Sequence, residues 1–147
     1  MREQLRFASA AARIGAVIRE FFADSRVAEE EYKHLLDRME GPDLDDRHHM
    51  AAAIAGRVQT LITWNLTDFP AFFMGRYGVT VTDPDMYLCS LLSQSPHEVV
   101  DVPARMAAGK LRPPMTVLDI IGALDRAGVP VFARRASSRL SGLGDER

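Results

Sequence analysis

Three oxygen-bearing side chains stand out because their spacing can bring them to one point. Asp46 opens a helix-forming stretch, and Asn65 and Asp68 follow directly after a short apolar segment with the composition of a buried strand. Ligand sites in open α/β sheets gather at the carboxyl ends of the strands. Carboxylates crowded together repel one another unless a cation shares the space, and hard oxygen ligands suit Mg²⁺ or Mn²⁺. These residues predict a divalent-metal site.

A simpler interpretation of the same residues stays open. In it, Asp46 caps a helix, and residues 65–68 form an Asx-type turn.

The elements that would position these residues follow from the spacing of apolar side chains. Apolar residues from 14 to 22 recur at helical intervals, so we expect a helix over 3–23 with one buried face. A second helix should end at Gly41-Pro42. A third, rich in alanine, should end at Gly56. The β-branched segments 60–64 and 79–82, with a helical turn over 70–76 between them, predict two parallel strands.

Beyond Asp83 the chain is expected to be helical. Asp83 stands at an N-cap position, Pro84 in the first turn, and the predicted buried stripe is Tyr87, Leu88, Leu91 and Leu92. Further helices are expected over 96–108, kinked or split at Pro103, and over 116–126 and 131–140. The tail is the most basic part of the chain through Arg134, Arg135 and Arg139, which can contact phosphate, although a solvated helix face explains them more simply.

Four motifs follow one another along the chain. They are residues 45–53 (DDRHHMAAA), 61–70 (LITWNLTDFP), 78–79 (GV) and 83–88 (DPDMYL). In this order they resemble the signatures of PIN-domain proteins, a family that includes the VapC-like toxin ribonucleases. The resemblance covers roughly residues 14 to 140 and is strongest to a branch with a helical carboxy-terminal extension.

The resemblance implies a fold and a division into domains. The fold would be an α/β, PIN-like three-layer arrangement, with a short parallel sheet flanked by helices. Residues 1–95 would form the PIN-like domain, and residues 96–147 a helical extension packed on the same domain.

The resemblance also implies roles for individual residues. Asp46 and Asp68 would be the acidic metal ligands, and Asn65 and Thr63 would line the site from the end of the strand. Asp45 is a second-choice ligand. Asp43 is expected to belong to a solvated acidic turn. The site would hold Mg²⁺ or Mn²⁺ and act on an RNA phosphodiester.

One departure from the family affects the expected activity. PIN domains begin with a strand that carries a central aspartate, followed by a glutamate on an early helix, and neither has a counterpart here. The chain is therefore expected to be amino-terminally truncated and to hold a divalent ion weakly, because affinity at such sites rises with the number of charged ligands. Activity and inactivity of this chain alone therefore both stay open.

Three functions stay open. The first is a metal-dependent endoribonuclease of the toxin-antitoxin type, with RNA as substrate, a cognate antitoxin and a possible homodimer. The second is a non-catalytic PIN-like protein that binds a partner or RNA without cleaving it. The third is a degenerate remnant.

The composition of the chain limits the classes of protein to which it can belong. A chain of 147 residues with a net charge of -2 predicts a single domain without a global cationic field, so any contact with nucleic acid needs a local basic patch. The single cysteine, Cys89, cannot form an internal disulfide. No apolar stretch reaches the roughly 18 residues of a membrane span. A cytoplasmic protein without membrane association is expected.

Overall fold

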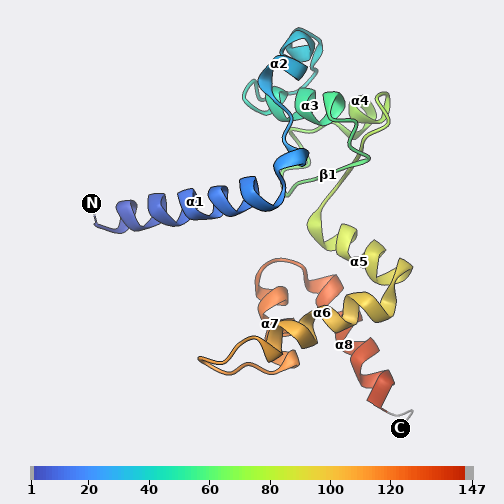
Figure 1. Ribbon diagram of the computed structural model, residues 1–147. Helices are drawn as coiled ribbons and strands as arrows, with labels where there is room; N and C mark the ends of the chain where they lie inside the picture. Colours follow the sequence, from blue (N-terminus) through green and yellow to red (C-terminus); the bar gives the residue numbers. More distant parts are fainter. Residues whose placement is uncertain (1, 145–147) are drawn as a thin grey trace. The chain divides into compact units, whose positions relative to one another are not determined.

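The computed structural model of the protein describes residues 2–144, and side chains over 12–141 (Figure 1). The chain divides into two compact units, Met1–Val58 and Gln59–Arg147. None of the described helices has both the length and the apolar composition needed to cross a membrane.

Unit 1 begins with the long helix α1 (Arg2–Phe21), which agrees with the helix expected over 3–23. The expected burial of its apolar stripe is wrong. Ile14, Val17, Ile18 and Phe21 are 51–71% exposed. The physical reason within this unit is that α1 packs on η1 (Ala23–Ser25), a single 3-10 turn that is too short to cover the stripe.

The rest of unit 1 packs around a helix of small side chains. The second expected helix is divided into α2 (Glu29–Tyr32) and the 3-10 helix η2 (Lys33–Arg38), and both contact α3 (Asp46–Ala55). Met50 and Ala51 of α3 are fully buried, because alanines let neighbouring backbones approach closely. The ring of His48 meets Tyr32 edge-on, with centroids 5.9 Å apart.

Unit 2 begins with a parallel pair of strands. β1 (Thr60–Ile62) pairs with β2 (Thr80–Thr82) in the register Thr60 to Thr80, and α4 (Ala71–Gly75) lies between them in sequence. The predicted parallel pair is confirmed, with strands shorter than expected. Phe73 and Met74 of α4 are buried. The α/β class is therefore confirmed, whereas the three-layer PIN-like arrangement stays a prediction.

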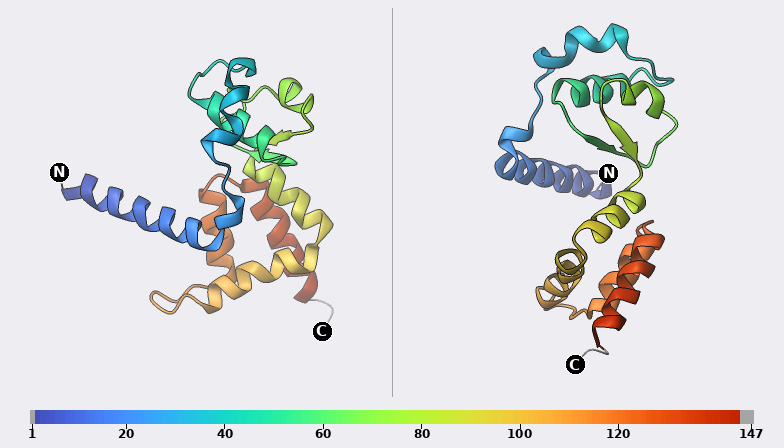
Figure 2. Two further views of the ribbon diagram at one scale, coloured as in Figure 1. Left: turned by 45° about the horizontal axis from the view of Figure 1, so that its top comes forward. Right: turned by 90° about the vertical axis from the view of Figure 1, so that its right-hand side faces the viewer.

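Four helices complete unit 2 as far as the structure describes it, to residue 144, and two views of them appear in Figure 2. They are α5 (Pro84–Gln94), α6 (Pro96–Ala108), α7 (Val117–Arg126) and α8 (Pro130–Gly144). α6 contains Pro103 without being split by it. The shared core comes from all four helices and the turn before α8, and its buried members are Cys89, Leu92, Val100, Ile121, Val129, Phe132, Ala133 and Ala136.

The buried line of α5 differs from the predicted one. Asp83 caps the helix as expected, since its carboxylate accepts the backbone N–H of Met86 at 2.9 Å. The buried residues are Asp85, Cys89 and Leu92, which stand at i, i+4 and i+7. Asp85 is buried because its carboxylate accepts the backbone N–H groups of Val131 and Phe132, at 2.9 and 2.7 Å, and so caps the first turn of α8.

Candidate metal centre

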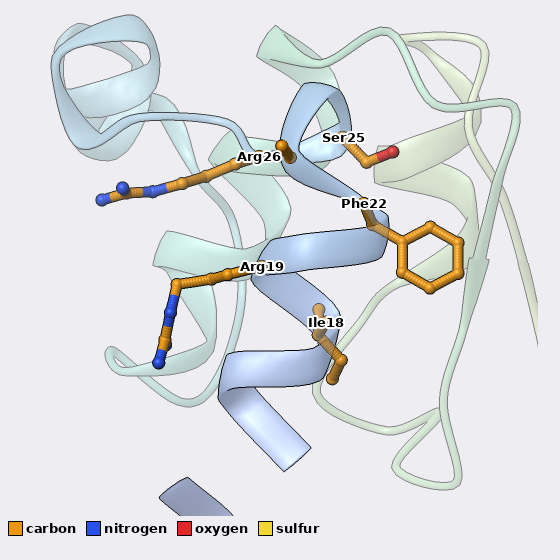
Figure 3. Close-up of a pocket in the computed structure, with 6 residues that line it drawn as sticks. Ile18, Arg19, Phe22, Ser25 and Arg26 are labelled. Atoms are coloured by element: carbon orange, nitrogen blue, oxygen red, sulfur yellow. The ribbon is translucent and has the colours of Figure 1, made fainter. Parts of the chain in front are cut away.

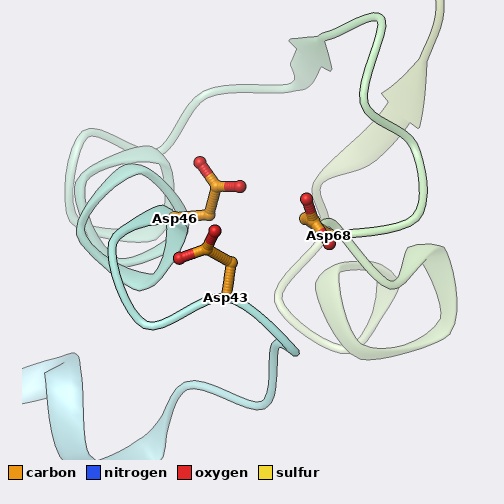
Figure 4. A group of neighbouring side chains, drawn as sticks. All are labelled: Asp43, Asp46 and Asp68. Atoms are coloured by element: carbon orange, nitrogen blue, oxygen red, sulfur yellow. The ribbon is translucent and has the colours of Figure 1, made fainter.

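Two aspartates lie together where α3 begins. Asp46 is the first residue of α3, and Asp43 lies in the turn before it (Figure 4). One carboxylate oxygen of each lies within 4.8 Å of the other. Oδ1 of Asp43 accepts the backbone N–H of Asp45 at 2.8 Å, which holds this turn in place. Arg47, the basic residue that follows Asp46 in the sequence, donates its guanidinium hydrogen bonds to the backbone carbonyl of Gly41. Two negative charges therefore face one another here.

The position of Asp43 differs from the one predicted from the sequence. The sequence assigned it to a solvated turn and preferred Asp45 as the additional ligand. Asp43 is indeed exposed, but its carboxylate is the one grouped with that of Asp46. The signal that could have revealed it is the i, i+3 spacing of Asp43 and Asp46, which puts two side chains on the same side of a helical turn.

The loop after β1 joins the three other predicted site residues. The N–H of Thr63 donates to the carbonyl of Thr82 at 3.0 Å, which extends the parallel pairing by one residue. The hydroxyl oxygen of Thr63 accepts the N–H of Asn65 at 3.0 Å. The amide nitrogen of Asn65 in turn donates to Oδ2 of Asp68. One chain of hydrogen bonds thus runs from the strand end to the Asp68 carboxylate.

This chain of hydrogen bonds determines which side-chain oxygen atoms stay available to a further partner. It uses the amide nitrogen of Asn65 and one oxygen of Asp68, so the amide oxygen of Asn65 and the other oxygen of Asp68 can bind a further partner. Asp68 is half-buried, and water screens a half-buried charge less than a fully exposed one.

The candidate ligands come from both units of the chain. Asp43 and Asp46 belong to unit 1, whereas Thr63, Asn65 and Asp68 belong to unit 2. Convergence of Asp46 with Asp68 on a single ion therefore stays a prediction.

The chemistry of the donor set fits Mg²⁺ or Mn²⁺. The side chains of this set offer carboxylate, amide and hydroxyl oxygens, and hard oxygen atoms are the ligands that these ions prefer. The close approach of Asp43 and Asp46 also supports a cation, because it leaves repulsion between like charges that a cation would relieve.

A cavity in unit 1 has a different character. It has a volume of about 430 Å³ and lies where α1 meets η1, and its lining residues are Ile18, Arg19, Phe22, Ala23, Ser25 and Arg26 (Figure 3). In this view Phe22 and Ser25 point to one side, and the two arginines point to the other. Among the residues whose side chains the structure describes, none with a carboxylate lines it. We therefore assign it no part in metal chemistry.

Comparison with known proteins adds two matches. Residues 84–138, which span α5 to α8, match the family model described as the VapC50 C-terminal domain. The chain is also 32% identical over 91 residues to the "Putative ribonuclease VapC50" of Mycobacterium tuberculosis (strain ATCC 25618 / H37Rv), which is 62% of this chain and 53% of that protein. The chain thus spans about half the length of the curated relative it matches. No solved structure matches it significantly.

Proposed function

Because this chain is a VapC-like protein, we propose that it acts as a divalent-metal-dependent endoribonuclease of the toxin-antitoxin type. RNA is then the substrate, and a cognate antitoxin and a second copy of the chain are its proposed partners. The curated relative is named a ribonuclease, which supports the reaction class.

The observation that carries the proposal is the placement of the acidic residues. Asp46 lies beside Asp43 at the start of α3, and Asp68 is held by Asn65 at the end of β1. In the proposed site, Asp46 and Asp68 bind one Mg²⁺ or Mn²⁺ ion, and Asp43 contributes a third carboxylate. When bound, such an ion supplies Lewis-acid chemistry toward a phosphodiester.

The neighbours of Asp68 would act as positioning residues. Thr63 fixes the backbone of Asn65, and Asn65 fixes the orientation of the Asp68 carboxylate. A ligand held in one orientation loses less conformational freedom when it binds its ion, so these two residues would strengthen metal binding without touching the metal.

The experiment is a calorimetric titration of the full chain with Mn²⁺. Wild-type protein should bind Mn²⁺, and Asp46→Asn and Asp68→Asn should each weaken binding by about tenfold or more, because each removes a charged ligand. Asp101→Asn is the matched control, since it removes an exposed carboxylate of α6. Cleavage of a labelled single-stranded RNA, with Mn²⁺ and with EDTA, is measured on the same proteins.

The outcomes separate the open functions. No Mn²⁺ binding by the wild-type chain, or equal binding by all variants, contradicts the metal site. Mn²⁺ binding without cleavage of any RNA favours the non-catalytic alternative. Cleavage that needs Mn²⁺ and is lost in Asp46→Asn and Asp68→Asn, but not in Asp101→Asn, supports the enzyme.

A further inference from the structure

A basic pocket lies between two helices of unit 2, away from the acidic residues in sequence. It has a volume of about 380 Å³, and its lining residues are Leu92 and Ser93 of α5 with Arg134, Arg135, Ser138 and Arg139 of α8. Of the lining residues that the structure describes, half are arginines and none is acidic. A volume of this size lies within the range of pockets that hold small ligands.

The walls of this pocket are held by the core of unit 2. Leu92 on α5 and Ala133 and Ala136 on α8 are almost fully buried in the shared core, and the two helices lie side by side (Figure 2). The arginines therefore project from a packed helix rather than from a loop. A site built on rigid elements loses little conformational freedom when a ligand binds.

The arginines are arranged so that their charges repel. Arg135 and Arg139 stand at i and i+4 on α8, and Arg134 lies next to them on the same side. Like charges at this spacing destabilise a helix. The hydroxyls of Ser93 and Ser138 donate to the carbonyls of Cys89 and Arg134, both at 3.0 Å. The guanidinium groups are therefore the donors that remain for an anion.

Arg135 marks the inner end of the pocket. Burial raises the pKa of the Cys89 thiol, and the neighbouring Arg135 guanidinium acts in the opposite direction by its charge and by a hydrogen bond. Since Cys89 is 2% exposed, a guanidinium that reaches it lies close to the core. As whole side chains all three arginines are exposed, so Arg135 reaches Cys89 while it stays accessible to solvent.

We propose that this pocket binds a backbone phosphate of single-stranded RNA. A guanidinium offers a planar fork of N–H donors that matches phosphate oxygens, and an arginine cluster offers several such forks. The overall charge of -2 requires that any basic patch be local. Residues 84–144 contain seven Lys or Arg and five Asp or Glu residues, which is a small local excess of positive charge. The inference rests on the proposed function, which names RNA as the substrate.

The test measures RNA binding by the full chain without metal. The probe is a fluorescein-labelled single-stranded RNA in EDTA, followed by fluorescence anisotropy. Arg134→Gln/Arg139→Gln removes two pocket charges, and Arg105→Gln/Lys110→Gln removes two exposed charges outside it. The pocket variant should bind RNA about fivefold or more weakly, and its slope of log affinity against log salt should fall by about 1.4, or about 0.7 per lost contact. The control should retain wild-type affinity.

Several outcomes of this experiment would contradict the proposed RNA site. Equal loss of affinity in the two double variants, unchanged binding by the pocket variant, or no binding by the wild type would each overturn the inference. Inorganic phosphate serves as a competitor and as a ligand by itself. Phosphate binding that depends on the arginines, without RNA binding, assigns the pocket to a free phosphate and also overturns the RNA proposal.

Failure of the metal site would be recognised separately. In EDTA, Asp68→Asn should bind RNA as tightly as the wild type, because the pocket does not include Asp68. Arginine-dependent RNA binding together with a failed Mn²⁺ titration contradicts only the ribonuclease proposal. A successful Mn²⁺ titration with RNA binding that ignores the arginines contradicts only the phosphate pocket. Circular dichroism of each variant verifies that the helices are retained.

Discussion

At the scale of single residues, aspartates of unit 2 perform distinct structural tasks. Asp83 caps its own helix, whereas Asp85 caps α8 from a distance of 46 residues in sequence. Asp119 and Thr116 cap α7 reciprocally, and the backbone N–H of Thr116, followed by its hydroxyl, lowers the pKa of Asp119. In each case the donors that surround the carboxylate, rather than the residue type, determine its role.

Asp85→Asn tests the long-range cap. The amide can present only one acceptor oxygen, so one of the two N–H groups at the start of α8 would face an NH₂ group. We expect a loss of about 1–3 kcal/mol in the free energy of unfolding, measured by urea denaturation. Asp83→Asn is the control and should be nearly neutral, because Asn and Asp are equally good N-caps. Equal effects of the two substitutions would refute the assignment.

At the scale of elements, three helix ends, those of α3, α4 and α7, share one exit geometry. Residues 57, 78 and 128 have positive φ angles, of 52°, 77° and 98°. After each of these helical segments two backbone bonds close the turn, such as Gly128 N–H to the Asp125 carbonyl and Val129 N–H to the Leu124 carbonyl. This is the Schellman pattern. Two of the positions hold glycine, and the third holds Arg57.

Arg57→Gly should stabilise the protein. A left-handed conformation costs a residue with a Cβ atom about 1–2 kcal/mol, and the greater freedom of glycine in the unfolded chain offsets part of this gain. The expected net increase in the free energy of unfolding is about 0.5–1 kcal/mol. Arg57→Ala keeps the strained backbone and should not stabilise. Chemical denaturation of both variants measures the difference, and a stabilising Arg57→Ala would show that the side chain is the cause.

At the scale of the whole molecule, the helical part of unit 2 has a core of its own. Its buried members and the partly buried side chains packed on them lie between Leu88 and Leu140. The matched family domain, residues 84–138, covers nearly the same range. A separate core indicates that this segment can fold by itself.

A fragment of residues 83–147 should therefore unfold cooperatively. It retains Asp83 as the cap of α5 and the whole core cluster, although a domain of this size buries a modest share of its surface and will be marginally stable. Circular dichroism during thermal unfolding checks this. Leu92→Ala in the fragment should remove about 2–5 kcal/mol and abolish the transition. A non-cooperative signal from the unmodified fragment would show that its core needs the remainder of the chain.

The sequence by itself determined what depends on neighbours along the chain. The cap at Asp83, the parallel strand pair and the four helices after it were all predicted correctly, because caps, turns and periodic apolar faces depend on residues a few positions apart. The motif order also predicted a resemblance to VapC-like proteins, and both matches found for the chain are to proteins described as VapC50.

The tertiary structure alone decided which distant groups meet. It placed Asp85 under α8, left the apolar stripe of α1 exposed, and gathered the arginines of α8 around a pocket completed by α5. No spacing in the sequence encodes these contacts. The physical reason is that burial and pairing depend on which elements pack together, and packing joins residues that are tens of positions apart.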